Sequence, residues 1–171
     1  MNIRLLFLVG IMATLSGCCV DPPATKIIYT GINILAEEIR TPNGSYVSFT
    51  VPVGVNRREE EADKKPAVCY TKVASFNFAN PFDTGRFVLQ LNKPLNAAGL
   101  VIPAYTNLLK LPIKGLGITN AYYNMSGNYP ERLIVHTDSA LVSWPADSRL
   151  IFRGTTVNQE TFADSVIVKL Y

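Results

Sequence analysis

The sequence predicts an all-β fold, an antiparallel β-sandwich of immunoglobulin-like character. Alternation of apolar and polar residues with period two recurs along the chain after residue 25, as is typical of strands that bury one face. Turn residues separate roughly eight short segments of this kind. No segment keeps a helical period for more than about three turns. Strands of this number and length bury a shared core as a sandwich or as a closed barrel.

The expected strands follow the chain in order. The first covers 26–35, and the clearest covers 46–53, where apolar residues occupy every second position: Val47, Phe49, Val51 and Val53. Further strands are expected at 67–78, 86–92, 108–111, 132–138, 140–144, 150–155 and 165–171. In the alternating strands we expect these side chains to face the core: Phe87, Leu89, Leu91, Leu133, Val135, Thr137, Val166, Val168 and Leu170.

The connections between these strands favour a sandwich over a barrel. The segments 54–66, 92–107 and 112–131 are long, as crossovers between two sheets can be. A lipocalin-like barrel of similar length is the alternative. Lipocalins carry a Gly-x-Trp signature on their first strand, whereas the only tryptophan here is Trp144.

The first residues have the features of a secretory signal. Residues 1–4 carry one positive charge, and residues 5–12 form a short apolar run. The uncharged stretch 5–20 is shorter than the roughly 20 apolar residues that a spanning helix needs. Leu15-Ser16-Gly17-Cys18 resembles the lipobox of bacterial lipoproteins, whose cysteine receives a diacylglyceryl group.

The lipobox resemblance implies a processed and membrane-anchored chain. Residues 1–17 would be the signal peptide, and 18–25 would be the lipidated Cys18 followed by a stiff Pro-containing spacer. Residues 26–171 would form a single domain. Several acyl chains on one terminus hold a protein firmly to a bilayer. Because Cys19, and not an aspartate, follows the lipidated residue, the outer membrane is the favoured location.

Two further cysteines remain after Cys18 is assigned to lipid. Cys19 and Cys69 form an even pair in an oxidising compartment, so a disulfide between them is one reading. Two separate, unbonded thiols are the other reading, and the sequence leaves both readings open.

Composition excludes several classes of partner. The 16 Lys and Arg nearly balance the 13 Asp and Glu, and no dense basic stripe is present, so nucleic acid is not expected as a partner. The mixed charge run 57–65 is typical of a solvated loop. One histidine and at most two free cysteines do not make a structural zinc site, and no calcium loop appears. We therefore expect neither a metal nor a cofactor.

A segment rich in Gly, Asn and Tyr is the candidate binding loop. It lies within 114–132, and its candidate contact residues are Tyr122, Tyr123, Asn124 and Tyr129. Tyrosine and asparagine suit the recognition of peptides and sugars alike. The same aromatic residues can instead fold back and close one end of the sandwich.

His136 is the only histidine, on the polar side of its strand with Asp138 as its neighbour two positions along. Asp138 could orient it as a base, but no Gly-x-Ser-x-Gly elbow accompanies it. We interpret it as a surface histidine and do not expect an enzyme. Ser139 and Ser165 lie in Asp-Ser-Ala and Asp-Ser-Val tripeptides that resemble the O-glycosylation motif of exported proteins in Bacteroidota.

As a whole the chain resembles the small, uncharacterised all-β lipoproteins of Bacteroidota in its layout and lipobox. That resemblance implies no activity. The expected function is a non-catalytic binding module, held at the cell envelope by its lipid, for a protein or a glycan. The alternative is a structural or assembly subunit of a surface fibre or envelope complex, and a hydrolase comes third.

Overall fold

The structure is a computed structural model that describes residues 19–20, 24–36, 38–41, 46–60, 69–70, 75–122 and 130–170. Its contacts divide the chain into two compact units. The smaller comprises 1–28 and 59–79, and the larger comprises 29–58 and 80–171. The lipobox and the candidate contact residues Tyr123, Asn124 and Tyr129 lie outside the described residues.

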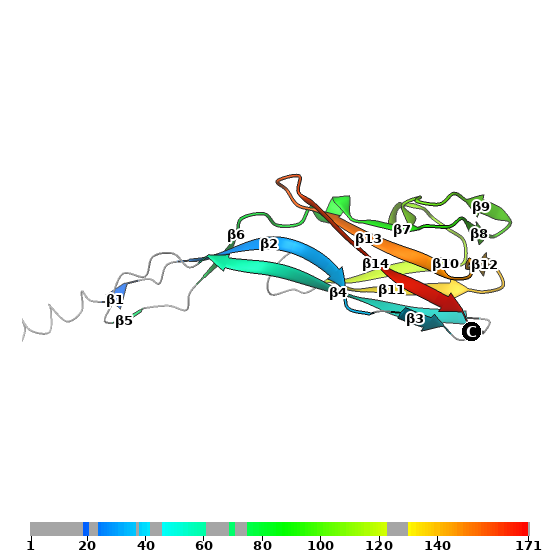
Figure 1. Ribbon diagram of the computed structural model, residues 1–171, viewed down its shortest axis with the longest axis horizontal. Helices are drawn as coiled ribbons and strands as arrows, with labels where there is room; N and C mark the ends of the chain where they lie inside the picture. Colours follow the sequence, from blue (N-terminus) through cyan, green and yellow to red (C-terminus); the bar gives the residue numbers. More distant parts are fainter. Residues whose placement is uncertain are drawn as a thin grey trace, which may run out of the picture. The chain divides into compact units, whose positions relative to one another are not determined.

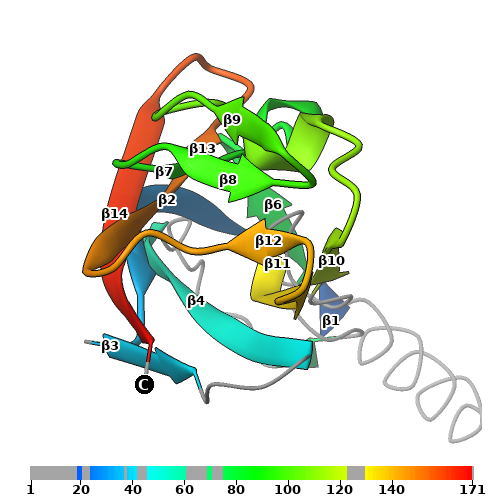
Figure 2. The same cartoon turned by 90° about the vertical axis from the view of Figure 1, so that its right-hand side faces the viewer.

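The larger unit is built from β-sheets, which confirms the predicted all-β sandwich (Figure 1). Four strands of one sheet follow in the order β10-β11-β4-β2, with β2 at Thr25–Ile34, β4 at Tyr46–Glu60, β10 at Leu116–Tyr122 and β11 at Pro130–Asp138. The second has the order β3-β14-β13-β7, with β3 at Glu38–Thr41, β7 at Val88–Leu91, β13 at Ser148–Thr155 and β14 at Thr161–Leu170. A small sheet of order β12-β8-β9 lies at one end (Figure 2), with β8 at Leu95–Ala97, β9 at Leu100–Ile102 and β12 at Val142–Ser143.

The core contains the side chains that the alternation predicts. Val51, Leu89, Leu133 and Val135 are fully buried. The same holds, within a few per cent, for the other predicted core positions whose side chains the structure describes: Phe49, Val53, Phe87, Leu91, Thr137, Val166 and Val168. Period-two alternation therefore identifies the inward face of β4, β7, β11 and β14 correctly, whereas Phe76, on the apolar side of the predicted strand 67–78, is 59% exposed.

Aromatic rings join the elements around the core. Phe87 stacks on Phe152 of β13 with ring centroids 5.4 Å apart, and Phe82 lies between Tyr29 of β2, at 5.0 Å, and Phe87, at 5.9 Å. Such pairs add stability beyond the area they bury. This cluster connects strands of both large sheets.

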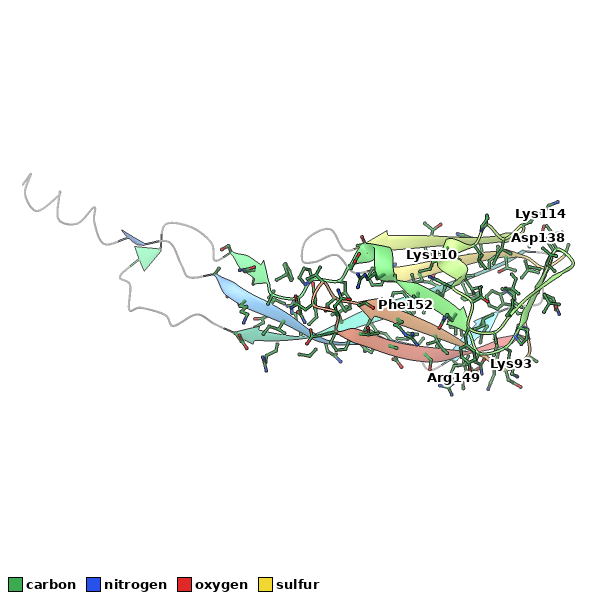
Figure 3. All side chains as sticks on the ribbon, turned by 90° about the horizontal axis from the view of Figure 1, so that it is seen from above. Lys93, Lys110, Lys114, Asp138, Arg149 and Phe152 are labelled. Carbon is green, nitrogen blue, oxygen red and sulfur yellow. The ribbon has the colours of Figure 1, made fainter. Side chains whose placement is uncertain are left out.

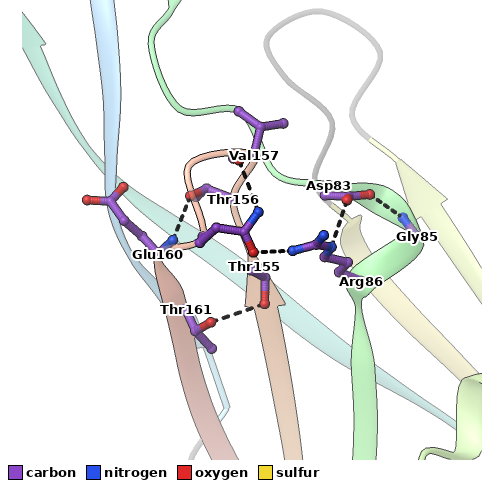
Figure 4. Close-up of polar contacts among 9 residues, drawn as sticks. Asp83, Gly85, Arg86, Thr155, Thr156, Val157, Glu160 and Thr161 are labelled. Carbon is purple, nitrogen blue, oxygen red and sulfur yellow. Dashed lines mark hydrogen bonds and ion pairs between the residues drawn. The ribbon is translucent and has the colours of Figure 1, made fainter.

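Polar contacts fix the turn between β13 and β14 (Figure 4). The N–H of Thr156 donates to the carbonyl of Glu160 at 2.8 Å, and the N–H of Glu160 donates to Thr156 Oγ1 at 3.2 Å. Arg86 bridges this turn to the preceding segment, because its guanidinium contacts Asp83 at 3.1 Å and donates to Gln159. The turn is thus fastened to the start of β7.

The smaller unit contains short parallel pairs. β1 (Cys19–Val20) pairs with β5 (Cys69–Tyr70), and the first residues of β2 pair with β6 (Phe76–Phe78). The N–H of Thr25 donates to the carbonyl of Ser75 at 2.9 Å. The sequence predicted one strand over 67–78, whereas the structure has β5 and β6 there with residues 71–74 outside its description.

Three local predictions are wrong. The segment 108–111 is a 3-10 helix, η2 (Leu108–Lys110), because the Asn107 side chain accepts the N–H of Leu109 at 3.2 Å and caps a turn. The charge run at 57–60 belongs to β4 and is not a loop. Of 140–144, only Val142 and Ser143 are strand, since the preceding residues form a turn closed by the N–H of Leu141 on the carbonyl of Asp138 at 3.0 Å.

Several elements were not predicted. The supposed connection 92–107 contains the hairpin β8–β9, and 112–131 contains β10. The chain also forms β3, which pairs in parallel with β14, where only antiparallel pairs were expected. The strand expected from residue 86 begins at Val88, after the 3-10 turn η1 (Thr84–Arg86).

Candidate functional site

A shallow hollow lies on the outer face of the first sheet, where β10 and β11 run side by side. Gly115, Leu116, Gly117, His136 and Asp138 line it, and its volume is about 380 Å³. The register pairs Gly117 with His136. Because Gly117 has no side chain, the hollow opens beside the imidazole of His136.

The two glycines have different roles. Gly115 has a φ of +84°, and a Cβ there would come within 2.8 Å of Leu141 Cβ, so the fold itself requires glycine. At Gly117 φ is not positive, and a Cβ would lie 3.8 Å from His136 Cβ, an ordinary contact. Neither backbone conformation nor space therefore requires glycine at 117, and the missing side chain leaves the hollow open.

The polar groups of the hollow are held by neighbours. The register of β11 and β4 places His136 opposite Ser48, and Ser48 Oγ lies 3.0 Å from His136 Nδ1. Asp138 Oδ1 accepts the N–H of Ala140 at 3.0 Å, and the N–H of Asp138 donates to the carbonyl of Gly115 at 2.8 Å. These bonds fix the imidazole and the carboxylate on the sheet.

The buried side of β11 supports this arrangement. Thr137, between His136 and Asp138, is fully buried, and its Oγ1 accepts the indole N–H of Trp144 at 3.1 Å. Trp144 in turn meets the ring of Phe49 edge-on at 5.5 Å. A rigid core therefore lies directly beneath the hollow.

The structure describes some of the predicted site residues and not others. The structure confirms that His136 faces away from the core and brings it together with Asp138. Ser48 was missed, since alternation shows that it faces outward but not which residue lies opposite. Tyr122 ends β10, and its side chain, like Tyr123, Asn124 and Tyr129, is outside the described residues.

The hollow has groups that bind polar ligands, but little that would accelerate a reaction. Ser48 is exposed on a regular strand, whereas acyl transfer needs preorganised donors in a site that excludes water. Within the described ranges, no group of three His, Cys, Asp or Glu side chains could hold a metal ion. The imidazole, the carboxylate and the neighbouring hydroxyl can form hydrogen bonds with a polar ligand.

No protein-family model matches the chain, and neither a curated protein nor a solved structure matches it. In the part of the chain that the structure describes, no helix has the length and apolarity to cross a membrane.

Proposed function

We propose that the chain is an outer-membrane-anchored envelope lipoprotein whose β-sandwich is a non-catalytic binding module, and that the hollow beside His136 binds a glycan. The Leu-Ser-Gly-Cys18 tetrapeptide supports the anchor. The observation that carries the binding role is the hollow itself, kept open by a glycine at a position where a Cβ would fit.

The chemistry of the hollow favours a sugar over an apolar ligand. Saccharide hydroxyls donate and accept hydrogen bonds, and the hollow presents an imidazole, a carboxylate and, next to the imidazole, the hydroxyl of Ser48. Polar groups converging on a concave surface fix the orientation of a ligand. Because the hollow is open, we expect it to hold one or two sugar units of a longer chain rather than enclose a small molecule.

Gly117→Val tests this proposal. A valine side chain would occupy the hollow, and on a glycan array we expect the variant to lose affinity for the glycan bound by the wild type by more than about tenfold. Thr119→Val is the matched control, since Thr119 is exposed one strand repeat further along β10 and does not line the hollow. Equal binding by both variants, or no glycan bound by the wild type, would contradict the proposal.

The anchor is tested separately. Metabolic labelling with palmitate should mark the wild type and not Cys18→Ala, because the acyl groups depend on that cysteine. Undiminished label in the variant would overturn the lipoprotein assignment and leave the glycan test unaffected.

A second candidate function, an assembly subunit, is favoured by β10. The strand β10 is seven residues long and lies at the edge of its sheet, where β11 is its one partner among the described strands. An open edge of this length can accept a strand from another chain. A photo-crosslinking residue at position 119 should then capture one defined envelope protein in cells, and the same residue at exposed Ser143 should not.

A hydrolase is the third candidate function, and only the contact between Ser48 and His136 favours it. It requires that a fluorophosphonate probe label the protein and that Ser48→Ala abolish the label. We expect no labelling, because the serine is exposed and its contact with His136 follows from strand register.

A further inference from the structure

The hairpin β8–β9 presents an apolar tip that the proposed glycan site does not use. Leu100 and Val101 are 71% and 68% exposed, the two highest values among the large apolar side chains that the structure describes. Ala98 and Gly99 form the two-residue turn, both with positive φ. Exposed apolar groups gathered at one place mark a contact surface.

The tip stands on a rigid base. Leu95 and Ala97 of β8 are buried, at 1% and 3% exposure. β12 pairs with the other edge of β8, and the N–H of Ala98 donates to the carbonyl of Leu141 at 2.6 Å. The hairpin therefore holds its two exposed side chains in fixed positions.

The exposed side chains point to opposite faces of the hairpin. Successive residues of a strand alternate in direction, so Leu100 and Val101 cannot both be buried against one flat surface. A partner that covers both must surround the tip. A fluid hydrocarbon layer does so without a preformed pocket.

Pairing of another strand with β9 is disfavoured. Across a two-residue turn Leu100 and Ile102 form the hydrogen-bonded pairs with β8, so only Val101 directs its N–H and C=O to the open edge. Pro103 follows at once and has no N–H to donate. One residue of free edge is a poor template for an added strand.

The charge of this part of the chain selects an anionic partner. Segment 84–130 contains Arg86, Lys93, Lys110 and Lys114 and no Asp or Glu. Figure 3 shows Lys93 and Lys114, with Asp138 beside Lys114, at the end of the larger unit where Figure 1 places β8 and β9, so two lysines accompany one carboxylate among the residues labelled there. A second copy of the chain, meeting tip to tip, would bring like charges together.

We propose that the β8–β9 tip inserts Leu100 and Val101 into an anionic phospholipid surface, with Lys93 and Lys114 on its head groups. Apolar side chains in the acyl boundary with lysines at the head groups are the pattern of interfacial membrane binding. The exposed ring of Tyr105, 59% accessible, follows the hairpin and suits the interface as well.

Tryptophan quenching by brominated lipids tests the insertion. Val101→Trp puts a reporter at the tip of the full chain, and the wild type, whose only tryptophan is the buried Trp144, gives the baseline. Val157→Trp is the matched control, because Val157 is an exposed valine, 51% accessible, in the β13–β14 turn. All three chains share one N-terminus, so acylation contributes equally and a failure of the anchor or glycan proposals leaves this result readable.

Vesicles of phosphatidylglycerol and phosphatidylcholine with brominated acyl chains should quench the Val101→Trp signal well beyond both references. Adding Leu100→Asp, or Lys93→Glu with Lys114→Glu, should lower the quenching of Val101→Trp to the level of Val157→Trp, because tip insertion and not the acylated N-terminus determines this signal. Quenching no greater than in Val157→Trp, or equal quenching with phosphatidylcholine alone, would overturn the proposal. So would a lipid-independent shift of the Val101→Trp emission that grows with protein concentration, which would identify a second copy as the occupant.

Discussion

At the scale of single residues, the buried side-chain amide of Asn80 forms hydrogen bonds with the backbone of Tyr29, as a neighbouring strand would. Its Oδ1 accepts the N–H of Tyr29 at 2.7 Å, and its Nδ2 donates to the carbonyl of Tyr29 at 2.9 Å and to Glu160 Oε2 at 2.6 Å. Asn80 and Tyr29 are both 2% exposed. Water therefore cannot replace these bonds.

Asn80→Leu should destabilise the fold by about 2–5 kcal/mol, because it removes the buried hydrogen bonds of the Asn80 amide with the N–H and C=O of Tyr29 and with Glu160. Urea unfolding measures the change. Asn96→Leu, at an exposed position of β8, is the control and should change the free energy of unfolding by less than about 0.5 kcal/mol. Equal unfolding midpoints for the two variants would refute this account of Asn80.

The two Asp-Ser tripeptides differ in their surroundings. Ser139 is exposed in the turn after β11, whereas Ser165 lies within β14, where its Oγ accepts from Arg149 at 3.0 Å. A modifying enzyme reaches an exposed turn more readily than the middle of a paired strand. If one of these tripeptides carries a glycan, we expect its mass to be lost in Ser139→Ala and kept in Ser165→Ala, and the reverse pattern would contradict this assignment.

At the scale of elements, the segment after β9 protects the edge of a sheet. Asn107 Oδ1 accepts the N–H of Leu89 at 3.1 Å, and its Nδ2 donates to the carbonyl of Phe87 at 3.3 Å. The N–H of Tyr105 donates to the carbonyl of Leu91 at 2.7 Å. The edge strand β7 is thereby covered without another strand, which limits edge-to-edge aggregation.

Asn107→Ala should uncover this edge. We expect a loss of about 1–3 kcal/mol in unfolding free energy and faster hydrogen exchange at the amide of Leu89, since one side chain serves both β7 and the cap of η2. Exchange at Leu133, in the other sheet, is the internal reference. Unchanged exchange at Leu89 would show that the covering does not depend on Asn107.

Sequence predicted strand faces well and element boundaries less well, for physical reasons. Alternation is local, so the inward positions of β4, β11 and β14 were predicted correctly. The hairpin β8–β9 has Ala-Ala-Gly at its turn and strands of only three residues, too short to show a period. The sequence Leu-Leu-Lys of η2 resembles a short strand, because no local pattern shows that the Asn107 side chain caps a turn there.

At the scale of the whole molecule, the candidate site depends on register that no local pattern contains. The sequence predicted His136 with Asp138 because they share a strand. It did not predict Gly117 and Ser48 beside His136, because a one-residue slip of β10 would replace Gly117 and a one-residue slip of β4 would replace Ser48. The parallel pairing of β3 with β14 was missed for the same reason.

Register also bears on the two cysteines of the smaller unit. The parallel pair β1–β5 sets Cys19 directly opposite Cys69. Neighbouring strands lie about 4.8 Å apart, which falls within the Cα separations of roughly 4.4–6.8 Å that a disulfide spans. We therefore expect the chain to carry a Cys19–Cys69 disulfide in the oxidising compartment to which the proposed export would deliver it.

Such a disulfide would close a long loop and stabilise the fold by roughly 4 kcal/mol through the entropy of the unfolded chain. Alkylation of the unfolded, unreduced protein followed by intact mass should find neither cysteine modified, and reduction should expose both. Cys19→Ser and Cys69→Ser should each lower the free energy of unfolding as much as the double variant does, because either change removes the whole cross-link. Two alkylated thiols before reduction, or additive losses in the double variant, would mean that the cysteines act as separate residues and that the register of β1 with β5 is held by the backbone alone.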